Sequence, residues 1–583
     1  MVHPSPTIAP HPATTDLKPL PVPELDATLD AYLYALDAVL DGDKREHARS
    51  IVENFRSGVS PKLDAALRKR AAQRDAQGTN WLHDEWYSSY LTVREPLPLA
   101  TNVGFQIAFP NQGMSTGLDR AVEFIQHATS VHLQAAAGAV PEDVDARGNR
   151  ITLNQWFVYA GGLRHPQVDE DVVWQTDLDA ANREIGVFVA GQLYAVQLSD
   201  AEGKLATSSG LRAALENILD TARAEKSPDL DFNAPSLLGS GVLAEVLPTI
   251  LSQGNNPAVY DRLRDMLFTI ELVDEEPRSD VDRIRDITFC PRGAWVYKPL
   301  SYQISLRDDW SAVHVEHSCQ DGATLVTAIA RMQNVSAPPQ ESATLSAPPI
   351  ERVVWEFDEA TADTVRAHLR AFTKQANRFM VDIVTVPHNQ PVEMPFKVSR
   401  DASAQLTMSI AQQLTFGRVR AVYEAVDMRE FRAGRTECLR AATPEAVTFA
   451  VKLVAGSATQ DDLLSAVNAH RGWVKRCKAG NGFDRHIQMM ASIDASHPFF
   501  RDPDATAARR DFLSTTSIGG ADQIVRYCFA PSLPEGFGIS YTPLPEAGEF
   551  CISWNSNTAH QAEAFAHNIV QASTMFWNFC ASL

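Results

Sequence analysis

Helical spacing of apolar residues dominates the first part of the chain. From about Leu25 to Arg74, apolar residues recur three and four positions apart, which places them on one face of a helix. The first run of such positions is Leu29, Tyr32, Leu33, Leu36 and Leu40, and the second is Ile51, Val52 and Phe55. The pattern predicts a helical opening.

Short runs rich in β-branched and aromatic residues follow between Thr101 and Asn334, and they alternate with further helical patterns. The predicted strands are Glu184–Leu198, Ala294–Ser305 and Ser311–His317, and the predicted helices are Leu118–Ala137, Gly210–Ala222 and Pro257–Ile270. Alternation of this kind is typical of a layered α/β domain.

A stretch without periodicity, VSAPPQESATLSAPPI, divides the chain. Its Ser, Pro and Ala content predicts a linker or long surface loop over Val335–Ile350. Beyond it the order repeats coarsely, with predicted strands at Val353–Phe357, Phe379–Val386, Ile524–Phe529 and Glu549–Trp554 and a helix at Ala360–Ala376. We expect a proline-rich tail (1–23), a helical segment (24–97), a first domain (98–350) and a second domain (351–583), the two domains sharing an architecture without a residue-level repeat.

Composition and charge exclude several classes of protein. The 583 residues are 45% hydrophobic and 21% charged, as in ordinary globular proteins. The chain has 52 Lys and Arg against 72 Asp and Glu, which gives a net charge of −20. Because the sequence also lacks a basic patch, a nucleic acid is disfavoured as a partner. No apolar run approaches the roughly 18 residues that span a bilayer. Seven scattered cysteines without a CxxC pair, and no recognisable targeting signal at the amino terminus, suggest a cytoplasmic protein.

Common cofactor signatures are missing. The sequence has no GxxxxGK[ST] loop, HExxH pair, GxSxG elbow or EF-hand loop. A GxGxxA pattern occurs at Gly239, Gly241 and Ala244, but no predicted strand precedes it, so it does not predict a dinucleotide site. We expect no metal and no tightly bound cofactor.

The segment SAVHVEHSCQDG, Ser311–Gly322, carries the strongest candidate chemistry. Alternation places His317 at the end of the predicted strand and His314 on the opposite side, and Asp321 completes an HxxxDG arrangement. An imidazole with an ordinary pKa near 6.5 suits a general base, and a carboxylate four residues on is able to fix the loop by pairing with an arginine. The alternative is a structural histidine followed by a helix N-cap aspartate. We interpret His314 as structural.

A hydroxyl-rich run, LSTTSIGG, is the second candidate. Its hydroxyl groups are able to donate to a developing oxyanion, although a run of Ser and Thr also suits an exposed strand. The residues are Ser514, Thr515, Thr516 and Ser517.

An arginine-containing segment is the third candidate. Gly434, Arg435 and Thr436 lead into a predicted helix near Ala442, and Phe483–His486 form a second polar cluster. An arginine held here is able to bind a substrate carboxylate bidentately or to pair with Asp321 across domains. The alternative is a solvated charged surface.

Taken in order, these segments resemble the carnitine/choline acyltransferase family. The similar stretches are KPLPVPELDATLDAYL (Lys18–Leu33), NWLHDEWYSSYL (Asn80–Leu91), VEHSCQDG, LSTTS and PEGFGISY (Pro534–Tyr541), so the resemblance runs from about residue 17 to the carboxyl end. It implies two domains like chloramphenicol acetyltransferase, each a mixed sheet with helices, and an active-site tunnel at their interface. It also implies that the amino-terminal helices pack with the second domain and that the isolated unit is a monomer.

The resemblance assigns catalytic roles to several residues. His317 is expected to be the general base that activates an acceptor hydroxyl for direct attack on a thioester, without an acyl-enzyme. Asp321 is expected to support it. Ser517 is the expected oxyanion donor, and one additional threonine in the run leaves Ser514, Thr515 and Thr516 as alternates.

The resemblance also assigns the acceptor site. Tyr423, Thr436 and Arg485 match positions that bind the carnitine carboxylate, which implies a carnitine-like or polyol acceptor. Cys438 stands where another threonine is common.

The donor site departs from the family pattern. Asp401 and Glu424 match positions near the pantetheine arm, but the lysines that bind coenzyme A phosphates correspond to Gln390 and Met394, and the basic residues left in the segment are Lys397 and Arg400. We therefore expect a pantetheine thioester as co-substrate, on an acyl carrier protein or coenzyme A, as in the release domain of a fungal reducing polyketide synthase. The rival interpretations are a conventional coenzyme A-dependent carnitine acyltransferase and a non-catalytic acyl- or carrier-binding module.

Overall fold

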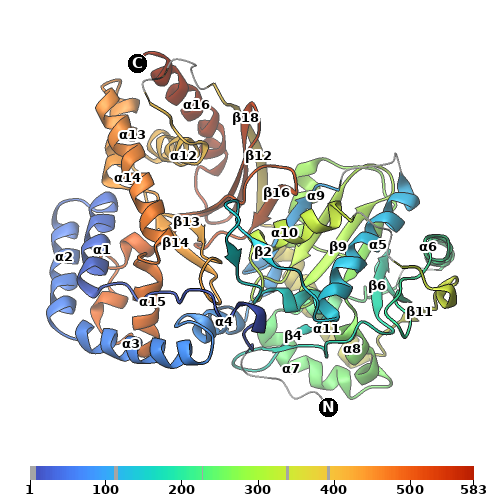
Figure 1. Ribbon diagram of the computed structural model, residues 1–583. Coiled ribbons are helices and arrows are strands. Elements are labelled where there is room, and N and C mark those ends of the chain that lie inside the picture. The colour runs from blue at the N-terminus through green and yellow to red at the C-terminus, as the bar shows by residue number, and fades with distance from the viewer. Residues whose placement is uncertain (1–7, 110–115, 226–227, 336–339, 390–393, 395) are drawn as a thin grey trace.

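Two mixed β-sheets with helices packed around them form the protein (Figure 1). The structure, a computed structural model, describes residues 8–109, 116–225, 228–335, 340–389, 394 and 396–583. The larger sheet has eight strands in the order β11-β7-β6-β8-β9-β10-β1-β16, and the smaller has six in the order β12-β18-β17-β15-β13-β14. Both sheets contain parallel and antiparallel pairs, as expected for mixed sheets.

The elements have the following bounds. The larger sheet contains β1 (Val103–Ile107), β6 (Glu184–Val189), β7 (Gln192–Gln197), β8 (Thr269–Val273), β9 (Leu300–Ser305), β10 (Ser311–Val315), β11 (Ile350–Val353) and β16 (Ile524–Phe529). The smaller contains β12 (Phe379–Pro387), β13 (Val422–Asp427), β14 (Thr436–Arg440), β15 (Leu513–Thr516), β17 (Phe537–Pro543) and β18 (Ala547–Asn555). Two short ribbons are β2 (Asp143–Val144) with β3 (Arg150–Ile151), and β4 (Leu163–His165) with β5 (Val172–Trp174). The helices are α1 (Leu25–Val39), α2 (Gly42–Ser57), α3 (Ser60–Ala76), α4 (His83–Leu91), α5 (Gly117–Ala136), α6 (Ser208–Ala224), α7 (Ser240–Leu251), α8 (Asn256–Asp265), α9 (Asp280–Phe289), α10 (Gly322–Gln333), α11 (Glu359–Ala376), α12 (Arg400–Phe416), α13 (Pro444–Val454), α14 (Gln460–Lys478), α15 (Asp484–Ile493) and α16 (Ala562–Ala581).

The two sheets repeat one topology. In the larger sheet, β6–β7 and β9–β10 are hairpins, and β8 lies between β6 and β9 and parallel to both. In the smaller sheet, β13–β14 and β17–β18 are hairpins, and β15 lies in the same way between β13 and β17. The common architecture expected for the two halves is therefore present in the order and direction of the strands. Only the first half has the HxxxDG segment after its last hairpin.

Two strands cross the expected division at residue 350. β11, which begins at Ile350, pairs with β7 at one edge of the larger sheet, and β16 pairs with β1 at the other edge. The larger sheet therefore takes strands from both sides of the expected boundary. Part of the expected linker, residues 336–339, lies outside the described residues.

The amino-terminal helices pack with the half that contains the smaller sheet. Tyr32 of α1 meets Phe483 edge-on with ring centroids 5.3 Å apart, and Phe55 of α2 stacks on Phe499 at 4.1 Å. These side chains belong to one hydrophobic core that also includes residues of β13, β15 and β17. The strands of the larger sheet pack mainly in a second core, and a smaller cluster joins Ala312 and Cys528 of that sheet to Val381 and Cys551 of the other.

Several predicted elements are corrected by the structure. The predicted helix Pro257–Ile270 ends at Asp265, and its last residues lead into β8, a short strand whose residues do not interrupt the helical pattern before it. The segment after Arg435 forms β14 before α13 begins at Pro444. β10 ends at Val315, two residues before His317. The expectation that no strand directly precedes the GxGxxA pattern is confirmed, because a 3₁₀ helix at Ala234–Leu238 stands there.

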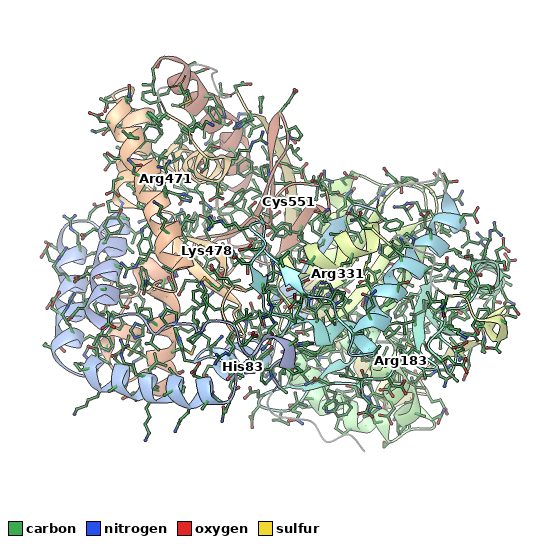
Figure 2. The ribbon with its side chains drawn as sticks, in the orientation of Figure 1. His83, Arg183, Arg331, Arg471, Lys478 and Cys551 are labelled. Atoms are coloured by element: carbon green, nitrogen blue, oxygen red, sulfur yellow. The ribbon has the colours of Figure 1, made fainter. Side chains whose placement is uncertain are left out.

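The described part of the chain has neither a helix suited to span a membrane nor a disulfide bond. None of the described helices combines the length and the apolar content needed to cross a membrane. All seven cysteines are free thiols, among them Cys551 in β18 (Figure 2).

Candidate active site

A cavity of about 670 Å³ is lined by residues of both sheets and of α4. The loop between β10 and α10, the strands β13, β14 and β15, and α15 all contribute to its wall, so segments far apart in the sequence meet there. The nine residues expected for catalysis and acceptor binding all line it: His317, Asp321, Tyr423, Thr436, Arg485, Ser514, Thr515, Thr516 and Ser517.

His317 is held with one ring nitrogen engaged. Its Nδ1 lies 2.6 Å from the carbonyl oxygen of Gln320. Because a carbonyl oxygen only accepts hydrogen bonds, Nδ1 carries the proton in this pair and Nε2 is left to accept one. Burial lowers the pKa of His317 below its usual 6.5, so the imidazole is neutral at physiological pH. The ring of Tyr90 meets the imidazole edge-on with centroids 5.4 Å apart.

Asp321 pairs with an arginine from the other half of the chain, as expected. Arg435 Nε lies 2.6 Å from Asp321 Oδ2, and its Nη2 lies 3.0 Å from Oδ1. Burial opposes ionisation of Asp321, but the Arg435 guanidinium holds the pKa of that carboxyl below its usual value. Arg435 also donates to the carbonyl oxygen of Ser318 at 2.9 Å, so the pair fixes the backbone beside His317. Asp321 thus acts on His317 through the loop, and its negative charge also opposes the lowering of the imidazole pKa by burial.

The four hydroxyl residues differ in whether their hydroxyl groups already have a hydrogen-bond partner. Thr515 Oγ1 donates to the carbonyl oxygen of Tyr423 at 2.7 Å and accepts from Gln405 Nε2 at 2.9 Å, and the hydroxyl of Tyr527 lies 3.4 Å from Thr516 Oγ1. The hydroxyls of Ser514 and Ser517 have no hydrogen-bond partner among the described residues. Ser517 also lines a second cavity of about 80 Å³ that Asp401 and Tyr541 line. It therefore lies where the catalytic space and the expected donor space meet.

The three expected acceptor residues contact one another. Arg485 Nη2 donates to the hydroxyl of Tyr423 at 3.0 Å, and its Nε donates to the carbonyl oxygen of Thr436 at 3.0 Å. The guanidinium lies over the ring of Trp86, 4.7 Å from its centroid. A fixed cation beside two hydroxyl groups is a suitable receptor for a carboxylate.

Two of the expected donor residues form a cluster with a histidine. His470 Nε2 lies 3.3 Å from Glu424 Oε2 and 3.5 Å from Asp401 Oδ2. The hydroxyl of Tyr541 donates to Asp401 Oδ1 at 2.5 Å and lies 3.1 Å from Glu424 Oε1. Burial raises the pKa of Glu424 to about 7. The Asp401–Glu424–His470 atoms are near enough together to hold a metal ion, as are those of His47, Asp502 and Asp504 on the surface.

The remaining donor residue, Lys397, lies apart from this cluster. Its side chain is exposed and makes no hydrogen bond or ion pair with another described residue. Arg400 donates to the carbonyl oxygens of Leu544 and Pro545. Met394 packs against the core of the smaller-sheet half, whereas Gln390 lies outside the described residues. The segment thus offers few free cations.

Some site residues could not be found from the sequence. His470 lies on α14, 46 residues from Glu424, and nothing in their spacing links them. Tyr90 and Tyr541 occur only within stretches quoted for their family resemblance. The structural role expected for His314 is confirmed, because its buried ring contacts the carbonyl oxygen of Ile287 at 2.7 Å and the amide of Asn102 at 3.0 Å.

Comparison with known proteins finds relatives that align with nearly the whole chain. The family profile described as Choline/Carnitine o-acyltransferase matches residues 20–571. Carnitine O-acetyltransferase from Homo sapiens is 24% identical, covering 95% of this chain and 92% of the relative. Mitochondrial carnitine O-palmitoyltransferase 2 from Bos taurus is 23% identical, covering 90% and 86%. Among solved structures, a trichothecene 15-O-acetyltransferase from Fusarium sporotrichioides aligns with a TM-score of 0.37 and 10% identity, over 84% of this chain and 94% of that chain.

Proposed function

The chain belongs to the choline/carnitine O-acyltransferase family, and from this premise we propose that it moves an acyl chain directly between a pantetheine thioester and an alcohol, with His317 as the general base. The observation that carries the proposal is the neutral imidazole of His317, fixed at Nδ1 and lying in one cavity with free hydroxyls and an arginine. The chain is an acyltransferase of this family; its substrates are the subject of the proposal.

The reaction needs one proton carrier and one oxyanion donor. His317 Nε2 takes the proton from the acceptor hydroxyl as its oxygen bonds to the thioester carbon. The Ser517 hydroxyl donates to the carbonyl oxygen that becomes negative, a role that contributes about 3 kcal/mol in other enzymes. When the carbon–sulfur bond breaks, the imidazolium returns its proton to the thiolate. No acyl-enzyme forms, because the acceptor oxygen attacks the thioester itself.

The acceptor is a carnitine-like molecule or a polyol. Arg485, Tyr423 and Thr436 converge in the cavity and support a site for a carboxylate or for several hydroxyls. Arg485 supplies the positive charge, and the two hydroxyl groups add neutral donors.

The donor carries pantetheine without depending on the nucleotide of coenzyme A. Met394 packs against the core, Lys397 is exposed, and Arg400 donates to carbonyl oxygens, so the segment expected to bind phosphates has little free positive charge. A carrier protein presents the pantetheine arm alone. This supports a release function in a reducing polyketide synthase. The second candidate, a conventional coenzyme A-dependent carnitine acyltransferase, is favoured by the similarity to carnitine O-acetyltransferase.

An initial-rate comparison separates these two candidates. The same medium-chain acyl group is offered on coenzyme A and on a short pantetheine thioester, with carnitine as the common acceptor. Equal rates, or faster transfer from pantetheine, are expected if the nucleotide contributes nothing. A large preference for coenzyme A would favour the conventional candidate, and no transfer from either donor to carnitine or to a polyol would favour a non-catalytic binding module.

A further inference from the structure

A second buried ion-pair network reaches the loop of His317 from the larger-sheet half. Arg164, at the centre of β4, donates through Nε to Asp171 Oδ2 at 2.7 Å and through Nη1 to Glu316 Oε1 at 3.0 Å. Its Nη2 donates to the carbonyl oxygen of Tyr90 at 2.9 Å. The side chains of Arg164, Asp171 and Glu316 are 1%, 0% and 3% exposed. We call these three residues the Arg164 network.

The network holds the backbone on both sides of His317. Glu316 directly precedes His317, and its Oε2 accepts from the hydroxyl of Ser318 at 2.6 Å, the residue directly after it. The backbone N–H of Ser318 lies 3.3 Å from Oε1 of the same carboxylate. β10 ends at Val315, and the last backbone bond to the neighbouring strand runs from the Glu316 N–H to the carbonyl oxygen of Pro299 at 3.1 Å, so the Glu316 carboxylate supplies the contacts that hold residue 318.

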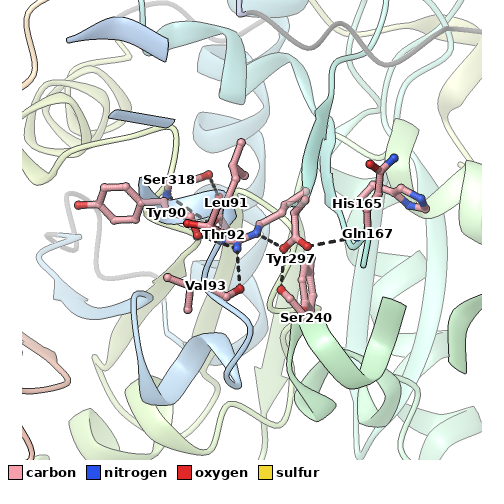
Figure 3. Close-up of polar contacts among 12 residues, drawn as sticks. Tyr90, Leu91, Thr92, Val93, His165, Gln167, Ser240, Tyr297 and Ser318 are labelled. Carbon is pink, nitrogen blue, oxygen red and sulfur yellow. Dashed lines mark hydrogen bonds and ion pairs between the residues drawn. The ribbon is translucent and has the colours of Figure 1, made fainter. Parts of the chain in front are cut away.

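The network also reaches the ring that packs on the imidazole. Tyr90 is the penultimate residue of α4, and Arg164 binds its carbonyl oxygen while the Tyr90 ring meets His317 edge-on. Figure 3 shows Tyr90 and Ser318 close together within this group, and the hydroxyl of Ser240 donates to Asp171 Oδ2 at 2.6 Å. The loop and the ring partner of His317 are therefore tied to one guanidinium.

We propose that Arg164 and Glu316 are positioning residues for His317. Neither is among the described residues that line the cavity, so they act through the loop and not on the substrate. A guanidinium presents donors in a fixed fork that satisfies two carboxylates and a carbonyl at once, which a lysine ammonium cannot reproduce. A misplacement of a catalytic group by about 1 Å costs on the order of 100-fold in rate. This inference rests on the proposed role of His317 as the base.

The test compares Arg164→Lys with a matched buried arginine. Arg183, which precedes β6, is 8% exposed and donates to the carbonyl oxygens of Ala160 and Asp265 at 2.6 and 2.7 Å, without a link to His317 (Figure 2). Arg183→Lys therefore measures the general cost of losing a buried guanidinium. We expect Arg164→Lys to lower kcat about 10- to 100-fold with both KM values within about threefold of wild type, and Arg183→Lys to keep kcat within about threefold.

A second variant distinguishes loss of the positioning contact from a folding defect. Ser318→Ala removes only the hydroxyl that ties residue 318 to Glu316, and it leaves the buried charges paired. We expect kcat to fall several-fold with a melting temperature near that of wild type. Equal kcat for Arg164→Lys and Arg183→Lys, with Ser318→Ala like wild type, would overturn the inference.

The proposed function fails in a distinguishable way. If wild-type protein transfers no acyl group from either donor, the role of His317 itself is refuted. If His317→Ala abolishes transfer while the Arg164 and Ser318 variants match Arg183→Lys and wild type, only the positioning role is refuted.

Discussion

The acceptor side and the donor side proposed for the site differ in how their charged side chains are held. On the acceptor side, Arg485 is partly buried, lies over the ring of Trp86 and is bonded to Tyr423 and to the backbone of Thr436. On the donor side, Lys397 is exposed and makes no hydrogen bond or ion pair with another described residue, while Glu424 is buried beside His470 and the Asp401 side chain next to them is 40% exposed. Fixed charge is thus supplied for the acceptor and hardly at all for an anionic donor.

This difference bears on which of the two proposed substrates the chain binds through fixed charges. A preorganised cation costs no rearrangement when a carboxylate binds, so the acceptor side is prepared for its ligand. An exposed lysine loses side-chain freedom when it binds a phosphate and is screened by salt, so it adds little. The reaction centre and the acceptor site therefore support transfer, whereas the nucleotide of coenzyme A has few partners. Three variants separate the two sides.

The largest effect is expected from replacing His317, which both substrates must approach in the proposed reaction. His317→Ala removes the general base, a group that contributes about 10²- to 10⁴-fold, and we expect kcat to fall by about 10³-fold. Binding of the pantetheine thioester, measured by calorimetry, should stay within about threefold, because the donor cluster does not contact His317. Transfer at the wild-type rate would mean that another group is the base. Loss of donor binding as well would mean that the two sides are not separable.

Sequence patterns anticipated the reaction centre better than the scaffold that holds it. The HxxxDG segment and the expected pairing of Asp321 with Arg435 could be predicted, because strand alternation and the chemistry of a carboxylate in a turn are local. Arg164 could not be predicted, since its link to Glu316 spans 152 residues and depends on how β4 packs against the β10–α10 loop.

For the fold as well, local patterns could be predicted from the sequence and long-range pairing could not. Long helices with a clear apolar face, such as α5 and α11, fall close to their predicted bounds. The short strand β8 was taken for the end of the helix that precedes it in the chain, and β16 was assigned to the second half because no local period shows which sheet a strand joins.

An intermediate effect is expected on the acceptor side alone. Arg485→Gln keeps much of the side chain's length but removes the charge, and hydrogen bonds to charged groups contribute about 1.5–3 kcal/mol, or roughly 10- to 100-fold. We expect the KM for carnitine to rise by that factor and the KM for the donor to stay within about twofold. Initial rates over a matrix of both substrate concentrations give the two values. A rise confined to the donor KM would reverse the assignment of the two sides, and thermal melting checks that the variant folds.

The smallest effect is expected on the donor side. Lys397→Ala removes the exposed ammonium of the segment, and surface charges of this kind contribute about 0–1 kcal/mol. We expect the KM for acyl-coenzyme A to rise by less than about threefold at physiological ionic strength and the KM for a pantetheine thioester to stay unchanged. Lys204→Ala, an exposed lysine in the turn after β7, is the matched control for the change in net charge. A tenfold rise for acyl-coenzyme A in Lys397→Ala, absent in Lys204→Ala and in the pantetheine assay, would show that Lys397 binds a phosphate. The donor side would then be prepared for its ligand after all, and the difference between the two sides would be one of exposure and not of function.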